Sequence, residues 1–231
     1  MRDVTMQMNP PCQSSVHALQ VLYEDNHLIA VNKPAGFLVQ GDISGDRTLM
    51  DVTKDYIRKK YGKPGRVFLG LVHRLDRPVA GVVLFAKTSK GASRVSEQLR
   101  SRKVIKIYWA LVHGKVDPAE GSLTSYLKKG EGRIQVTNQA DPHAREAILS
   151  YTTMRFKEHK SLLEIRLHTG RKHQIRAQLA AMGFPIEGDV QYGAPYALAW
   201  NTIRLLAKSL TLKHPTQDRR ITIEAPDPDW L

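Results

Sequence analysis

Cysteine is almost absent from this sequence of 231 residues, since Cys12 is the single one. One thiol excludes an internal disulfide framework and any zinc or iron–sulfur site built from several cysteines. No segment approaches the roughly 18 apolar residues that a membrane-spanning helix needs. Residues 1–15 also lack the apolar core of a secretory signal. We therefore expect a soluble, cytoplasmic protein in a reducing compartment.

Two further kinds of site find no support in the sequence. No glycine-rich phosphate loop of the P-loop or dinucleotide-binding type is present. The nine histidines are scattered, and no two share a predicted helix at the i,i+4 spacing of a helical zinc site. Clustered carboxylates are also missing, which argues against a metal-dependent nuclease.

Acidic residues are few beside the basic ones. The chain carries 35 Lys plus Arg against 22 Asp plus Glu, a net charge of +13. Such an excess suits a polyanionic partner, because phosphates neutralise cations that would otherwise repel one another. Charge alone favours a nucleic acid, while a membrane surface or a basic protein with solvated lysines stays open.

The spacing of apolar residues predicts one domain over 19–231 behind a loose N-terminal arm over 1–18. We expect helices over 48–61, 89–101 and 171–182. We expect strands over 19–23, 28–32, 67–72, 81–86, 104–113, 147–156, 162–169, 203–212 and 221–224. Many strands in runs with a few isolated helices indicate an α+β fold with a mixed, mostly antiparallel β-sheet.

A first polar cluster lies between two strongly apolar strands. Its ionisable members are His73, Arg74, Asp76 and Arg77. A carboxylate flanked by arginines is stabilised as an anion, and an ionised Asp can serve as a nucleophile or an electrostatic stabiliser. The alternative is a strand connection with ordinary ion pairs of little energetic weight.

A second cluster begins the helix expected over 171–182. Thr169 is placed to cap this helix, and its first turns carry Arg171, Lys172, His173 and Arg176. These cations oppose the helix macrodipole, and two of them are like charges at i,i+4. Such a helix start is understandable if it faces a carboxylate or a phosphate. A solvated basic face is the alternative.

Tyr108 lies in the strand over 104–113, on the same face as Lys106. A tyrosine beside a cation suits stacking on a base with a phosphate contact. A half-buried structural tyrosine is the alternative. Two carboxylates elsewhere, Glu164 and Asp189, show no visible link to Asp76 in the sequence.

Together these motifs resemble the RluA-type family of RNA pseudouridine synthases. The resemblance runs from about Val21 to the C-terminus and rests on four motifs in the family's order. They are Asn32-Lys33-Pro34-Ala35-Gly36, His73-Arg74-Leu75-Asp76, Lys106-Ile107-Tyr108-Trp109-Ala110-Leu111-Val112, and Thr169-Gly170-Arg171-Lys172-His173-Gln174-Ile175-Arg176. Gly183-Phe184-Pro185-Ile186, Gly188-Asp189 and Tyr192-Gly193 complete the pattern.

The resemblance implies isomerisation of specific uridines to pseudouridine in structured ribosomal or transfer RNA, without cofactor or metal. Asp76 matches the catalytic aspartate, attacking at the base or the ribose, and Arg171 matches the cation that pairs with it. Tyr108 matches the aromatic that stacks on the flipped base. Arg74 matches the residue inserted where the uridine was removed, which offsets the cost of flipping. A catalytically silent RNA-binding protein that keeps the fold is the alternative.

The resemblance also implies helices flanking the sheet, a basic catalytic cleft, and the short form of the family without its extra N-terminal RNA-binding domain. RNA recognition would then come from the catalytic domain itself, and we expect a monomer without membrane contact. The expected RNA-binding residues are His73, Arg74, Arg77, Arg94, Arg100, Arg102, Lys103, Lys106, Lys172 and Arg176. The chain departs from the family pattern at Val79-Ala80, Gln178 and Leu206.

Overall fold

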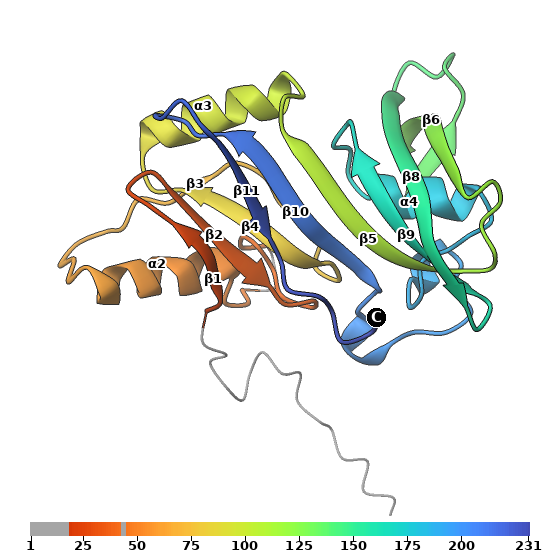
Figure 1. Ribbon diagram of the computed structural model, residues 1–231, viewed down its shortest axis with the longest axis horizontal. Coiled ribbons are helices and arrows are strands. Elements are labelled where there is room, and N and C mark those ends of the chain that lie inside the picture. The colour runs from red at the N-terminus through yellow and green to blue at the C-terminus, as the bar shows by residue number, and fades with distance from the viewer. Residues whose placement is uncertain (1–18, 43–44) are drawn as a thin grey trace, which may run out of the picture.

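The computed structural model describes residues 19–42 and 45–231, and an elongated, twisted β-sheet runs through all of it (Figure 1). The arm expected over residues 1–18 lies outside the described residues. The helices are α2 (Leu49–Lys60), α3 (Ser89–Arg100) and α4 (Gln174–Ala181), with short 3-10 turns η1 (Val190–Tyr192) and η2 (Ala199–Asn201). None of the helices described is long and apolar enough to cross a membrane.

Eleven strands of the described residues form this sheet. They are β1 (Val21–Glu24), β2 (Leu28–Lys33), β3 (Gly70–Leu71), β4 (Ala80–Ala86), β5 (Ile105–His113), β6 (Glu120–Lys129), β7 (Ile134–Thr137), β8 (Arg145–Lys157), β9 (Lys160–Leu167), β10 (Leu205–Lys213) and β11 (Arg220–Glu224). Their order is β1-β2-β4-β10-β5-β9-β8-β6-β7, with β3 beside β4 and β11 beside β10. Only the pairing of β4 with β10 is parallel among the described strands. The predicted α+β class with a mostly antiparallel sheet is confirmed.

One edge of β10 is shared by two strands. Leu206 and Ala207 pair with β4, and the residues from Ser209 onward pair with β11. At this fork Gly81 has φ +116°, and an added Cβ would lie 2.3 Å from the Ala207 carbonyl oxygen. The close approach of two backbones therefore requires glycine at this position.

Alternating side chains build a core on each face of the sheet. Val31 and Phe85 belong to a first core with Ile57 of α2 and Leu179 of α4. Ala30 and Leu84 belong to a second core with Val95 of α3. Because strand side chains alternate between faces, α2 and α4 cover one face and α3 covers the other. The first core carries the site described below.

The start of α4 differs from the expectation. The helix begins at Gln174, because His173 adopts a left-handed conformation with φ 51° and breaks the helical run. Thr169 is not the cap, since its hydroxyl accepts from the Ile148 N–H and donates to the Gln174 side chain. Arg171 and Lys172 therefore lie in the loop before the helix. The strand expected over 67–72 is only the two residues of β3, and β6 and β7 were not expected.

Candidate active site

Asp76 lies in the connection between β3 and β4, on the face covered by α2 and α4. Its neighbours Leu75 and Val79 are buried in the first core. The Asp76 carbonyl accepts a hydrogen bond from the Val79 N–H at 3.1 Å, which closes a tight turn. The side chain itself is 30% exposed. Buried anchors on both sides thus hold the carboxylate at the surface of the core, accessible to a substrate.

Two basic side chains face this carboxylate. Arg176 Nη1 lies 3.8 Å and His173 Nε2 lies 3.7 Å from Asp76 Oδ2. Both distances are longer than a hydrogen bond. A cation at this distance stabilises the anion while leaving its oxygens available, which suits a nucleophile.

Arg176 is held by a buried acid. Its guanidinium donates to both oxygens of Asp189, at 2.6 and 2.8 Å, and to Gln191 Oε1 at 2.8 Å. The Arg176 and Asp189 side chains are only 5% and 1% exposed. Burial would lower the pKa of Arg176, but the interactions with Asp189 outweigh it and raise that pKa. The cation facing Asp76 is therefore permanently charged and fixed in place.

Tyr192 supports both basic residues. Its hydroxyl lies 3.0 Å from His173 Nδ1, and its ring lies 4.8 Å from the Arg176 guanidinium carbon. Burial lowers the pKa of His173 more than the charge of Asp76 raises it. The His173 imidazole is thus mostly neutral at pH 7, and Arg176 supplies the positive charge at Asp76.

Tyr108 and Lys106 reach the same face from β5. Burial and the negative charge of Asp76 both raise the pKa of Tyr108, so its phenol stays protonated at neutral pH. Burial and then the nearby Arg102 lower the pKa of Lys106 to about 8, and its ammonium donates to the Thr169 carbonyl at 3.3 Å. The site therefore pairs one accessible carboxylate with an aromatic hydroxyl and fixed cations.

Lys33, the last residue of β2, is completely buried. Its ammonium donates to the carbonyls of Pro34, Phe37 and Arg77, at 3.0, 2.7 and 3.0 Å. Burial lowers the pKa of Lys33 to about 7, although the charge of Asp76 opposes the shift. Because Arg77 directly follows Asp76, Lys33 fixes the backbone on which the carboxylate is carried.

The structure places three of the expected site residues in contacts that differ from the prediction. Arg171 does not pair with Asp76, because it precedes α4 and its Nε donates instead to the Glu146 carbonyl at 2.9 Å. Arg176 lies 3.8 Å from the carboxylate instead, and its burial leaves little surface for the expected RNA contact. His73 is not a cationic RNA contact either, because its Nε2 accepts the Leu84 N–H and burial lowers its pKa to about 4.

Apart from Lys106, described above, the other expected RNA contacts divide into two groups. Arg74 and Lys172 are exposed, and each is close in sequence to a residue of the site. Arg77 instead donates to the Gly36 carbonyl and pairs with Asp46. The remaining four lie on α3 or the turn that follows it. Arg94 donates to the Pro215 carbonyl, Arg100 pairs with Glu97, Arg102 approaches Glu146, and Lys103 lines a groove. Among the described residues no three His, Cys, Asp or Glu side chains cluster as a metal site would require.

Sequence reasoning missed the roles of Lys33, His173, Asp189 and Tyr192. All four stand inside the quoted motifs, so their presence there was the available signal. Their roles depend on contacts across the fold. Asp189 meets Arg176 from 13 positions away, and Lys33 reaches Arg77 from 44 positions away.

Comparison with known proteins identifies relatives over most of the chain. Residues 27–181 match the family model described as RNA pseudouridylate synthase. A tRNA pseudouridine synthase C from Pasteurella multocida is 35% identical, and the match covers 92% of this chain and 93% of that protein. A ribosomal large subunit pseudouridine synthase C from Buchnera aphidicola is 34% identical, over 89% of this chain and 66% of that protein. The human RNA pseudouridylate synthase domain containing 4 structure superposes with a TM-score of 0.77 and 25% identity, over 91% and 89% of the two chains. The resemblance carried by the motifs is confirmed.

Two departures from the family pattern lie against each other. Ala80 and Leu206 are directly paired between β4 and β10, and both contribute to the second core. Apolar side chains on both partners add no polar group to that core.

Proposed function

The chain belongs to the RNA pseudouridylate synthase family, and from that premise we propose that Asp76 is the nucleophile with which it isomerises uridine. As a member of that family the protein is an isomerase that forms pseudouridine in RNA. The accessible Asp76 carboxylate, 3.8 Å from a buried Arg176, is the observation that carries the proposal.

The reaction conserves all atoms of the nucleotide. The bond from base nitrogen 1 to the ribose breaks, the uracil turns within the site, and base carbon 5 bonds to the ribose instead. Carbon 5 loses its proton and nitrogen 1 gains one. Asp76 attacks either the ribose or the base and is released intact at the end, so each turnover regenerates the carboxylate.

The surrounding residues have separate roles in the reaction. Arg176 stabilises the carboxylate before attack and as leaving group. Tyr108, held protonated beside Asp76, stacks on the displaced base and donates or accepts a proton through its hydroxyl. Exposed Arg74 enters the RNA where the uridine was, which offsets a flipping cost of a few kcal/mol. Lys33 and Asp189 are positioning residues.

We propose structured RNA in the cytoplasm, ribosomal or transfer, as the substrate, because relatives named for each match most of this chain. The test is release of tritium from carbon 5 of labelled uridine. Wild-type protein is incubated separately with unmodified large-subunit ribosomal RNA and transfer RNA from cells lacking the gene. Release from either RNA supports the proposal and assigns the substrate class. Tight binding to both without release would make the protein a silent RNA-binding member of its family.

A further inference from the structure

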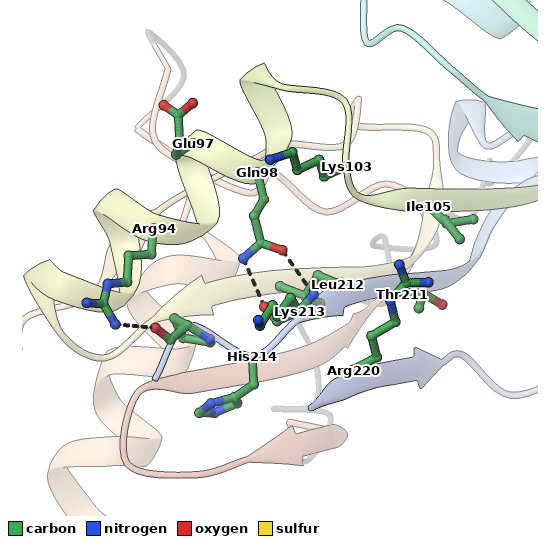
Figure 2. Close-up of a pocket in the computed structure, with 11 residues that line it drawn as sticks. Arg94, Glu97, Gln98, Lys103, Ile105, Thr211, Leu212, Lys213, His214 and Arg220 are labelled. Atoms are coloured by element: carbon green, nitrogen blue, oxygen red, sulfur yellow. Dashed lines mark hydrogen bonds between the residues drawn. The ribbon is translucent and has the colours of Figure 1, made fainter. Parts of the chain in front are cut away.

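A groove remote from Asp76 lies between α3 and the paired strands β10 and β11. It has a volume of about 550 Å³, and Gln98 crosses it from α3 to bond both the N–H and the carbonyl of Lys213 (Figure 2). Ile105 and Leu212 contribute apolar lining. These side chains belong to the opposite face of the sheet from Tyr108, because they alternate with it or pack in the second core.

The charged lining of this groove is predominantly positive. Its cations are Arg94, Lys103, Lys213 and Arg220, against the single acid Glu97, which is paired with Arg100. Arg94 donates to the Pro215 carbonyl and Lys213 pairs with Asp218. Lys103 and Arg220 are exposed, and within residues 19–42 and 45–231 neither side chain has an acidic partner. Two unneutralised cations at one groove attract an anionic ligand.

The composition of the lining points to a sugar–phosphate backbone. No Phe, Tyr or Trp lines the groove, so it offers no ring on which a base could stack. The one imidazole, that of His214, lies 2.6 Å from Asp25 through its Nε2 and accepts N–H bonds through its Nδ1. Cations without aromatic stacking partners contact the phosphates and do not discriminate between base sequences.

The groove is connected to the active site through the turn after α3. Lys103 is preceded by Arg102, whose guanidinium lies 3.9 Å from the Glu146 carboxylate. Arg171, in the loop before α4, donates to the carbonyl of the same Glu146. Lys103 precedes Tyr108 by only five residues, about 17 Å of extended chain. Arg171, Arg102 and Lys103 thus form a series of basic side chains between the site and the groove.

We propose that this groove binds phosphates of the RNA flanking the reacting uridine, with Lys103 and Arg220 as the contacts. The inference rests on the proposed function, since it places a second part of the same substrate. It assigns Arg220, and a surface on the opposite face of the sheet, to RNA binding. The groove recognises the course of the RNA backbone, whereas the site around Asp76 acts on the base.

The test compares two double variants of the full chain that remove the same charges. Lys103→Gln with Arg220→Gln alters the groove. Lys115→Gln with Arg155→Gln is the matched control, because both residues are exposed near the other end of β5.

Binding to bulk transfer RNA and to large-subunit ribosomal RNA is measured between 50 and 200 mM salt. Loss of two phosphate contacts reduces the slope of log K against log salt by about 1.4–1.8. Wild type then loses roughly tenfold more affinity over this range than the groove variant.

The control pair should keep the wild-type slope, and Lys103→Arg with Arg220→Lys should retain it because the charges remain. Equal slopes for the groove and control variants would overturn the proposal. So would unchanged RNA binding together with lost binding of inorganic phosphate, which would assign the groove to a small anion. Binding is measured without turnover, so failure of tritium release by wild type would reject the proposed function separately.

Discussion

Replacing Arg176 with glutamine tests how much the buried guanidinium contributes to stability. The variant removes both hydrogen bonds to Asp189 and leaves that carboxylate, 1% exposed, without its cation. An uncompensated buried charge costs about 3–5 kcal/mol of stability. The urea midpoint should fall by about 1 M or more. Arg58→Gln, which breaks an exposed pair with Asp55, should cost less than about 1 kcal/mol and serves as the control.

A second variant distinguishes the structural role of Arg176 from its role at Asp76. Arg176→Met with Asp189→Leu removes the whole buried pair, so most of the lost stability should return. Activity should not return, because Asp76 still lacks a cation at 3.8 Å. An interaction at that distance amounts to about 4 kcal/mol at an effective dielectric of about 20, and we expect at least about a hundredfold loss of tritium release. Recovery of activity together with stability would refute the assignment of Arg176 to the nucleophile.

Other parts of the fold give three further predictions. Lys33→Met should cost about 2–4 kcal/mol in urea unfolding, because three carbonyls lose their donor. The pKa of Lys33 is about 7 in the folded protein, so between pH 7 and 10 the unfolded chain binds more protons than the folded one. The free energy of unfolding of the wild type should therefore increase as pH rises through this range, and Lys33→Met should lack this increase. Gly81→Ala should cost at least about 3 kcal/mol by forcing β4 from β10, and wild-type thermal stability in this variant would contradict the fork geometry. Burial raises the pKa of Glu24, but hydrogen bonds from Lys60, Lys87 and Tyr61 bring it to about 2. The stability that ionised Glu24 contributes should therefore be lost as pH falls from 4.5 towards 2. Glu24→Gln should make the free energy of unfolding depend less on pH over this range.

Local patterns were sufficient where an element carries its own signals. Thr48 forms a capping box with Asp51, and α2 begins and ends within a residue of the expected span. The strand expected over 104–113 is β5 with one residue fewer, because its alternation is strong. In β6 most residues are polar on both faces, so no period-two apolar pattern marks it. Its pairing with β8 decides its structure, and that contact is not visible locally.

The sequence motif predicts Asp76 as the nucleophile, whereas the contacts of the arginines differ from the expectation. Asp76 stands in the motif His73-Arg74-Leu75-Asp76, on which the prediction rests. Choosing between Arg171 and Arg176 depends on where α4 begins, and this start is set by the left-handed His173. The buried partner Asp189 then draws Arg176 inward. Both causes depend on the fold, so the choice of Arg171, which the resemblance implied, could not take them into account.

The most direct test of the account is single-turnover tritium release by Asp76→Asn, with RNA affinity measured on the same preparation. Asparagine keeps the shape of the side chain and removes the nucleophile. We expect no release above background, with affinity for RNA within about threefold of wild type, because Asp76 is an anion and makes no phosphate contact. Asp229→Asn, a change at an exposed carboxylate, should release tritium at the wild-type rate. Appreciable release by Asp76→Asn would contradict the assignment of Asp76 as the nucleophile.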